Sequence, residues 1–255
     1  MIPAVSDRPG DMDQTRRDAS RTAALAFARR LAAAWERDLR ERLLGVYAIG
    51  SLAHYGFSTR YSDIDVALIA EDAEISQDLA RLRGHAAAQS AEHAPKLSLF
   101  WTDRHFSVGR FPPLDRLDLI DHGIPLVERQ HVRPPRPPLG EVRAYLGADP
   151  LRNWSLQVEK LNALDELTSN NRKAYMRALL YPARFAYSWT MGLMASNDAA
   201  VAWLRPHAPA GLDVELVERA LRCRNEDGDP DHLFPERAKL LRQRDACMRL
   251  AAALP

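Results

Sequence analysis

Two aspartates one residue apart, Asp63 and Asp65, open an apolar run, and eleven residues separate them from the pair Gly50-Ser51. On a strand alternate side chains share a face, so both carboxylates are expected to point the same way. Paired carboxylates at a strand edge suit Mg²⁺, which takes one or two carboxylates together with phosphate oxygens. The Gly-Ser turn can offer backbone N–H groups and a hydroxyl to a phosphate. The pattern therefore predicts metal-assisted chemistry on a nucleoside triphosphate.

An aspartate pair or a Gly-Ser turn alone is common, but their combination at this spacing is much more specific. Residues 46–69 resemble the signature of the nucleotidyltransferase superfamily related to DNA polymerase beta: Gly-Ser, a short spacer, and Ser-Asp-x-Asp within a strand. The resemblance implies that a nucleoside monophosphate is moved from a triphosphate, ATP, to an acceptor hydroxyl. It assigns catalysis and Mg²⁺ binding to Asp63 and Asp65, and nucleotide binding to Gly50, Ser51 and Ser62. His54, inside the loop, is expected to contact phosphate or nucleobase, the alternative being a histidine that faces water.

A second stretch, from Ala183 to Gly192 with Asp198 and Trp203 beyond it, resembles the helical C-terminal domain of aminoglycoside adenylyltransferases that act on streptomycin and spectinomycin. That family has Ala-Arg, an aromatic residue, Tyr-Ser and a glycine four residues later, then the start of a helix that contains an aspartate and runs to Ala-Trp. The resemblance implies AMP transfer to a small hydroxylated acceptor, with Arg184 on the triphosphate. From the residues alone, Arg184 either extends past the core to water or faces an anion.

The sequence departs from the superfamily at the third carboxylate, which normally lies on the next strand. Ser98 stands where Asp or Glu is expected, and a serine hydroxyl is a poor base near neutral pH. Asn197 stands where the aminoglycoside family has a lysine that reaches the triphosphate. Another carboxylate then serves as base, or the chain is a nucleotide-binding regulatory protein with weak or lost catalysis. The carboxylates that could serve by position are Glu92, Asp103, Glu159, Asp165 and Glu166.

Apolar periodicity and proline content predict the organisation of the chain. We expect an α/β nucleotidyltransferase domain over residues 1–130, with a small mixed sheet and flanking helices. A linker with four prolines follows over 131–140, and an all-α helical-bundle domain that binds the acceptor occupies 141–255. Residues 1–13 are expected to be frayed. The expected strands are 46–49, 63–70 and 96–102, and the expected helices are 18–44, 77–90, 155–168, 171–192, 197–205, 213–224 and 232–253.

The charge balance is almost neutral, with 35 Lys and Arg against 34 Asp and Glu, so nucleic acid is not expected as a partner. No apolar run approaches the roughly 20 residues that span a bilayer, and the two cysteines lack metal-like spacing. These features favour a cytoplasmic protein, and the resemblance implies a nucleoside triphosphate and a small-molecule hydroxyl acceptor as its partners. A cationic acceptor would need an acidic cleft, for which the helical domain offers Asp165, Glu166, Asp198, Asp213 and Glu215.

Overall fold

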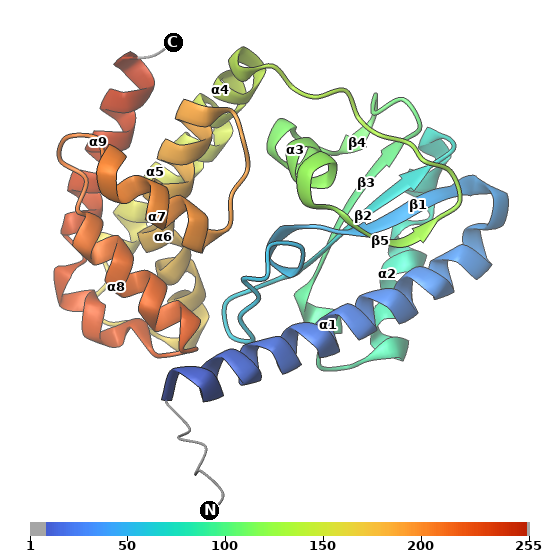
Figure 1. Cartoon of the computed structure of the whole chain (residues 1–255), viewed down its shortest axis with the longest axis horizontal. Coiled ribbons are helices and arrows are strands. Elements are labelled where there is room, and N and C mark those ends of the chain that lie inside the picture. The colour runs from blue at the N-terminus through green and yellow to red at the C-terminus, as the bar shows by residue number, and fades with distance from the viewer. Residues whose placement is uncertain (1–8, 254–255) are drawn as a thin grey trace, which may run out of the picture.

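The computed structural model describes the backbone of residues 9–253 and the side chains from residue 15 onward. A sheet with its helices and a group of helices from the second half of the chain lie side by side (Figure 1). Strands β2 and β3 run parallel, and the other neighbouring strands are antiparallel, which confirms the predicted mixed sheet. In the spatial order β4-β3-β2-β1-β5, the strands are β1 (Leu43–Ala48), β2 (Ile64–Ala70), β3 (Leu97–Asp103), β4 (Gly109–Arg110) and β5 (Ile124–Glu128).

Helices cover both faces of the sheet: α1 (Pro9–Leu39) and α2 (Leu79–Gln89) on one face, and α3 (Pro113–His122) on the other. Side chains along β2 alternate between these faces. Val66 and Leu68 join the cluster that contains residues of α1 and α2, whereas Ala67 and Ile69 pack in the cluster that contains Leu119 of α3. Because residues two apart share a face, Asp65 lies on the side of the sheet that α3 covers.

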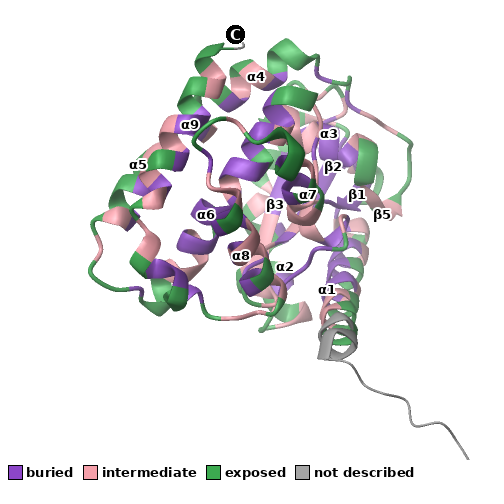
Figure 2. Cartoon of the chain, turned by 60° about the vertical axis from the view of Figure 1, so that its left-hand side comes forward, coloured by how far each residue is buried: buried purple, intermediate pink, exposed green. Residues whose placement is uncertain are grey.

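The second half of the chain forms a helical bundle around α6, which packs against α4, α5, α7, α8 and α9. A capping box of Thr168 and Asn171 begins α6, and Gly192, with a φ of 65°, ends it. In Figure 2 buried residues concentrate along α6 and on the strands, so each part of the chain has its own core. The helices are α4 (Leu139–Gly147), α5 (Asp149–Asn162), α6 (Ser169–Met191), α7 (Asn197–His207), α8 (Val214–Asn225) and α9 (Lys239–Ala253). The predicted fold class, an α/β part followed by a helical bundle, is confirmed.

The first helix differs from the one expected over residues 18–44, because α1 ends at Leu39. Arg40 takes a left-handed φ of 51° and opens a short 3-10 turn. Leu43 and Leu44 then enter β1 and bury their side chains in the clusters on opposite faces of the sheet. Both positions fit a helical pattern, but burial on two faces of a central strand places them in the sheet.

Two further expectations about helices need correction. Residues 9–13, expected to be frayed, belong to α1, whereas residues 1–8 lie outside the described residues. The helix expected over 232–253 is preceded by a 3-10 helix, Pro230–Glu236, and α9 begins only at Lys239. Proline cannot supply the N–H that an α-helix needs in its interior, and two prolines in this segment favour the tighter turn. The remaining short 3-10 helices are Arg40–Arg42, Gly50–Leu52, Ala73–Gln77 and Ala94–Lys96.

The region between β3 and α5 holds four elements that the periodicity did not predict: β4, α3, β5 and α4. α3 begins at Pro113, where a proline is favoured because the first turn of a helix leaves its N–H groups unpaired. Between β5 and α4, residues 129–138 contain neither helix nor strand, and this stretch overlaps the expected linker over 131–140. The domain boundaries at 130 and 141 remain a prediction.

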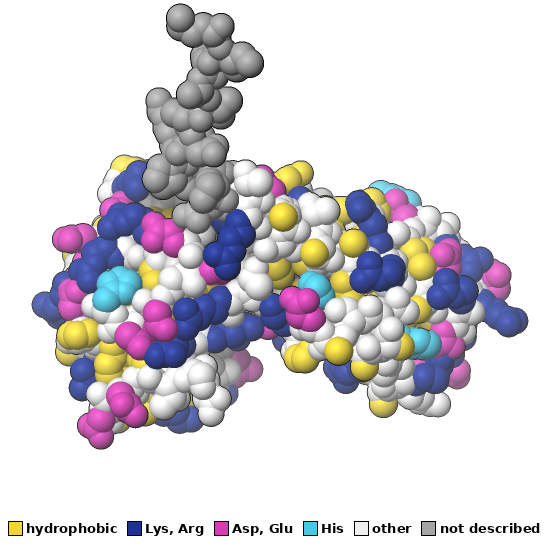
Figure 3. Space-filling view, turned by 90° about the horizontal axis from the view of Figure 1, so that it is seen from below, with side chains coloured by type: hydrophobic (Ala, Val, Ile, Leu, Met, Phe, Trp, Pro, Cys, Tyr) yellow, Lys and Arg dark blue, Asp and Glu magenta, His cyan; other side chains and the backbone are white. Residues whose placement is uncertain are grey.

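The surface carries both signs of charge. On the face seen in Figure 3, Lys and Arg side chains are interspersed with Asp and Glu side chains. Among the described residues, no helix combines the length and the apolar character that crossing a bilayer requires. The interspersed charges agree with the near-neutral composition from which a long polyanionic partner was not expected.

Candidate active site

The turn after β1 is built around Gly50, which has a left-handed φ of 64°. L-residues with a side chain rarely adopt this conformation, whereas glycine does so without steric cost. A Cβ at this position would also lie 2.4 Å from Oδ2 of Asp65, so no other residue fits without displacing that carboxylate. The glycine predicted to hold nucleotide therefore lets the Gly-Ser turn lie directly against one of the two predicted metal ligands.

A buried aspartate of α3 holds this turn in place. The Gly50 N–H donates to Oδ2 of Asp118 at 2.6 Å, and Oδ1 of Asp118 lies 2.6 Å from Nε2 of His54. Both side chains are nearly inaccessible, with 7 % of His54 and 2 % of Asp118 exposed, and the His54 ring packs against His122. On the other side, Nε of Arg21 donates to the Leu52 carbonyl at 2.7 Å. His54 lines the same cavity as the turn, and its ring nitrogen Nε2 is engaged by Asp118.

The hydroxyl of Ser51 is buried and has no hydrogen-bond partner among the described residues. Ser51 also lines the cavity in front of the turn. Leaving a buried hydroxyl unpaired costs about 1–3 kcal/mol, so a ligand oxygen that bonds to it would recover that free energy. The hydroxyl is therefore suited to a phosphate oxygen, which is the role that its position beside Gly50 predicts.

Asp63, one residue before β2, is held by two cations of α6. Its Oδ1 accepts from Nζ of Lys173 at 2.5 Å, and its Oδ2 is bonded by the Arg177 guanidinium. The Asp63 side chain is 29 % exposed and the two cations are more exposed, so these ion pairs are partly solvated and individually weak. The site at Asp63 therefore already attracts positive charge, and a metal ion there would exchange with Lys173 or Arg177.

Asp65 lies deeper and pairs across the parallel strands with Ser98, the residue at the position of the expected third carboxylate. Burial, together with the negative charge of Asp63, raises the pKa of Asp65 to about 6, although a hydrogen bond from Ser98 opposes the rise. A nearby cation would lower this pKa again, because an opposite charge favours the ionised carboxylate. Asp63 and Asp65 thus form one acidic pair with unequal surroundings.

A second acidic pair, Asp115 and Asp118, lines the same cavity from α3 and was missed by the sequence analysis. Burial, together with the negative charges of Asp118 and Asp65, raises the pKa of Asp115 to about 7, although the positive charges of Arg184 and Arg110 oppose the rise. The available signal was the spacing of the two aspartates, i and i+3, between Pro113 and the end of α3, which puts them on one helix face. Nothing local relates that face to Asp65, because only the tertiary fold brings α3 to the sheet.

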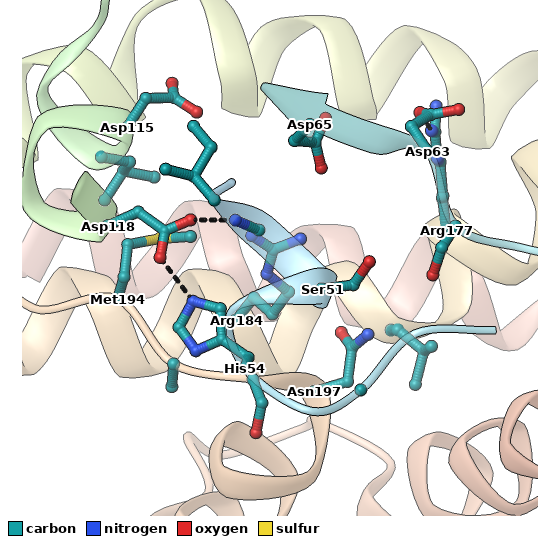
Figure 4. Close-up of a pocket in the computed structure, with 18 of the residues that line it drawn as sticks. Ser51, His54, Asp63, Asp65, Asp115, Asp118, Arg177, Arg184, Met194 and Asn197 are labelled. Carbon is teal, nitrogen blue, oxygen red and sulfur yellow. Dashed lines mark hydrogen bonds and ion pairs between the residues drawn. The ribbon is translucent and has the colours of Figure 1, made fainter. Parts of the chain in front are cut away.

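The cavity has a volume of about 450 Å³ and lies between the sheet and the helical bundle. Figure 4 shows Asp115 and Asp118 on one side, Asp65 and Asp63 on the other, and Ser51, His54, Arg184 and Asn197 between them. Arg184 is an exposed residue of α6, and Asn197 is the first residue of α7. All seven site residues predicted from the sequence line this one cavity: Gly50, Ser51, His54, Ser62, Asp63, Asp65 and Arg184.

Ser62 also has a structural part, because its hydroxyl is already engaged within the protein. Ser62 Oγ accepts from the Ser58 N–H at 3.0 Å and from the Arg224 guanidinium at 2.9 Å. Arg224 comes from α8, also donates to the Gly56 carbonyl at 2.8 Å, and is 5 % exposed, and burial lowers its pKa to about 10. Through Arg224 the helical bundle is therefore hydrogen-bonded to the loop that precedes Asp63. These bonds hold the bundle against the segment that contains Gly50 and Ser51.

None of the five carboxylates proposed by position as substitutes for the missing one lines the cavity formed by the described residues. Asp103 instead accepts from the N–H and hydroxyl of Ser107, and these bonds lower its pKa despite partial burial. Glu159 pairs with Arg244 on the surface. The five acidic residues expected to form a cleft for a cationic acceptor are likewise absent from the lining: Asp165, Glu166, Asp198, Asp213 and Glu215. The negative charge of the lining comes instead from aspartates of α3 and from Asp63 and Asp65.

The residues present fit Mg²⁺ only as a partial protein site. No group of three or more His, Cys, Asp or Glu side chains in the described part of the chain could hold a metal ion. Mg²⁺, however, commonly takes one or two carboxylates and completes its shell with water and substrate phosphates. Asp63 and Asp65, beside an unpaired Ser51 hydroxyl, meet that smaller requirement.

Comparison with known proteins gives a match in fold. Neither the family models nor the curated proteins contain a match to this chain. Among solved structures, the crystal structure of spectinomycin adenyltransferase AAD(9) from Enterococcus faecialis with ATP and spectinomycin is similar, with a TM-score of 0.59 and 12 % sequence identity. The match covers 83 % of this chain and 94 % of that one. The chain therefore shares the fold of a spectinomycin adenyltransferase, in agreement with the resemblance found in its sequence motifs.

Proposed function

We propose that the protein binds ATP with Mg²⁺ in this cavity and transfers AMP to a hydroxyl group of a small acceptor. The observation that carries the proposal is the convergence of the Gly50-Ser51 turn, the Asp63–Asp65 pair and Arg184 on one cavity. These residues come from both parts of the chain, and ligand sites commonly lie where two such parts meet. The likeness in fold to an adenyltransferase solved with ATP supports the same interpretation.

In this proposal the triphosphate lies between the Gly-Ser turn and α6. The unpaired Ser51 hydroxyl donates to a phosphate oxygen, and Arg184 of α6 supplies positive charge to the same cavity. Arg177 also lines the cavity and can turn from Asp63 to the phosphates once a metal ion takes its place. Guanidinium groups suit this exchange because they bind carboxylate and phosphate with the same planar geometry.

Asp63 and Asp65 would hold Mg²⁺, which withdraws charge from the α-phosphate and stabilises the pyrophosphate leaving group. The chain itself excludes water and orients the reacting groups. Asp118 fixes the Gly50 N–H, and Arg224 fixes the loop that precedes Asp63, so both halves of the motif are rigidly placed. Preorganised positioning of this kind supplies much of the rate acceleration in transfer from a nucleoside triphosphate.

The cavity must hold the triphosphate as well as the acceptor. Its volume of about 450 Å³ therefore favours a small-molecule acceptor over a polymer. Tyr145, Tyr181 and Phe185 give one wall an aromatic surface, and the Tyr181 hydroxyl is buried without a hydrogen-bond partner among the described residues. Asp115 and Asp118 add negative charge, as a cationic acceptor requires. We therefore propose an acceptor with hydroxyl groups and positive charge, of the aminoglycoside kind.

The alternative, a nucleotide-binding regulatory protein, is favoured by Ser98 alone. Ser98 lies beside Asp65 in the register of the parallel strands and offers no carboxylate. A protein that binds ATP and Mg²⁺ but transfers nothing would have this fold and this cavity. The two functions differ in product formation, which is the property to measure.

The test is to incubate the protein with ATP, Mg²⁺ and either spectinomycin or streptomycin and to follow the acceptor by mass spectrometry. The proposal predicts a mass gain of one AMP group on the acceptor and release of pyrophosphate, both lost without Mg²⁺. ATP binding by calorimetry with no product from either acceptor would favour the regulatory alternative. Absence of ATP binding would overturn both functions.

A further inference from the structure

The structure shows what surrounds the place where the third carboxylate is missing. Ser98 of β3 is opposite Asp65 of β2, and both lie on the face of the sheet that packs against α3. Phe100, two residues beyond Ser98, shares this face and belongs to the same buried cluster as Leu119 of α3. Helix α3 therefore packs over the face of the sheet on which Ser98 and Asp65 lie.

Helix α3 stands between the two cores of the molecule. Leu119 packs on the sheet, whereas Leu117 is buried in the core of the helical bundle and Leu114 packs against it. Asp115 and Asp118 are on the part of the helix that faces the cavity (Figure 4). This arrangement places two carboxylates across from Asp65 by packing on both sides of the helix, so their position is rigid.

We propose that Asp115 is the general base of the transfer reaction and takes the role that the absent carboxylate at position 98 has lost. This inference rests on the proposed function and names a catalytic residue for it. The acceptor O–H gives its proton to a carboxylate oxygen of Asp115, and the acceptor oxygen forms a bond to the α-phosphorus of ATP. The bond from the α-phosphorus to the bridging oxygen breaks, and pyrophosphate leaves with the electron pair. Asp115 then returns the proton to water.

Asp115 suits this role better than Asp118 because of what each carboxylate already binds. Asp118 accepts from the Gly50 N–H and contacts Nε2 of His54, so both of its oxygens are engaged. Asp115 has no hydrogen bond or ion pair to its carboxylate among the described residues, although it is half-buried and lines the cavity. The free carboxylate can accept a proton, whereas the bonded one is a positioning residue for the Gly-Ser turn.

The charged and titratable groups around Asp115 tune its proton affinity. Burial and the negative charges of Asp118 and Asp65 raise the pKa of Asp115 to about 7, and Arg184 and Arg110 oppose the rise. Tyr145 of α4 faces it as well, and burial together with the charge of Asp115 raises the pKa of that phenol. A base whose pKa is near the working pH is well matched to proton transfer.

The experiment compares three variants with the wild type in pyrophosphate release from ATP and Mg²⁺, with spectinomycin and streptomycin as acceptors. Asp115→Asn should lower turnover about 10²–10⁴-fold, the usual contribution of a general base, while ATP affinity by calorimetry stays unchanged. Asp121→Asn, on the same helix but exposed and paired with Arg136, is the matched control and should keep wild-type turnover. The double variant Ser98→Glu/Asp115→Asn should turn over about tenfold faster than Asp115→Asn, because the new carboxylate lies beside Asp65.

A second readout does not depend on turnover. Carbon-13 NMR of aspartate carboxyls in the wild type should show one group that titrates with a midpoint near 7 and is missing from Asp115→Asn. Turnover should rise with pH through the same midpoint, because only the ionised carboxylate accepts a proton. If Ser98→Glu/Asp115→Asn lacks this pH dependence, the pH profile of the wild type arises from Asp115.

The possible results distinguish a wrong assignment of the general base from a wrong proposed function. An Asp115→Asn variant with wild-type turnover, or an Asp115 carboxyl that titrates near 4, overturns the assignment of the base. Wild-type protein that binds ATP together with an acceptor and still transfers nothing also overturns it, and leaves the nucleotide site standing. Protein that binds no ATP overturns the proposed function itself.

Discussion

The two acidic pairs of the cavity consist of the same residue type and differ in what surrounds them. Asp63 directly precedes β2, is partly exposed, and pairs with Lys173 and Arg177. Asp115, on α3, has no such partner in the described part of the chain, and its pKa is raised. These surroundings support our proposal that Asp63 binds a cation and that Asp115 takes a proton, since neighbouring carboxylates in different environments can have separate roles. The type of a residue alone therefore does not predict its chemistry; the groups around it must also be known.

The largest effect is expected within the α3 pair. Asp118→Ala leaves the Gly50 N–H and the buried His54 ring without their partner, and each unpaired group costs about 1–3 kcal/mol. The variant should therefore lose about 2–4 kcal/mol of unfolding free energy in urea denaturation. Asp121→Ala, which removes only an exposed ion pair of the same helix, should lose less than about 1 kcal/mol. Equal losses in the two variants would mean that Asp118 does not hold the turn.

The next effect concerns the contact between the Gly-Ser turn and Asp65. Gly50→Ala imposes a left-handed φ on a residue with a side chain, at a cost of about 1–2 kcal/mol, and pushes its Cβ against the carboxylate. Weaker ATP binding should accompany the lower stability. Gly84→Ala, in the middle of α2 with open space around it, should instead stabilise the protein by about 1 kcal/mol. Calorimetry and urea denaturation of both variants measure the difference, and unchanged ATP binding in Gly50→Ala would separate the turn from the nucleotide site.

The smallest effect is expected at the ion pairs of Asp63. Arg177→Ala removes one competing cation, and because the pair is partly solvated its loss should tighten binding of Mg²⁺ alone by at most about fivefold. ATP should bind more weakly to the same variant, since Arg177 lines the cavity. Arg152→Ala, whose partner Asp149 is mostly exposed and outside the lining, is the control and should change neither affinity. If both ligands bind more weakly to Arg177→Ala, the exchange of guanidinium for metal is wrong.

The sequence predicted one acidic pair and not the other for a physical reason. Gly50, Ser51, Asp63 and Asp65 are close along the chain, and their local pattern carries the strand, the turn and the carboxylates together. Asp115 meets Asp65 only through packing of α3 on the sheet, which no local pattern encodes. The fold class was predictable because apolar periodicity repeats over many residues, whereas element ends depend on single conformations such as that of Arg40.

The same limit applies to residues whose identity was predicted but whose contacts were not. Ser62 was assigned to nucleotide from its place before Asp63, and the structure adds its bonds to Arg224 and Ser58. The arginine lies 162 positions away in the chain, so only the assembled molecule relates the two. A motif therefore predicts which residues meet a ligand more readily than it predicts which residues hold the motif.

We propose that Asp63 and Asp65 bind the metal and that Asp115 serves the acceptor. The measurement that tests this difference is calorimetry of ATP binding at fixed Mg²⁺. It is made on the double variant Asp63→Asn/Asp65→Asn and on the single variant Asp115→Asn. The first variant should lose Mg²⁺-dependent ATP binding while keeping its fold by circular dichroism. The second should bind ATP as the wild type does, because the Asp115 carboxylate serves the acceptor in our proposal. Retained Mg²⁺-dependent binding in the first variant, or equal loss in both, would show that the two pairs do not have separate roles.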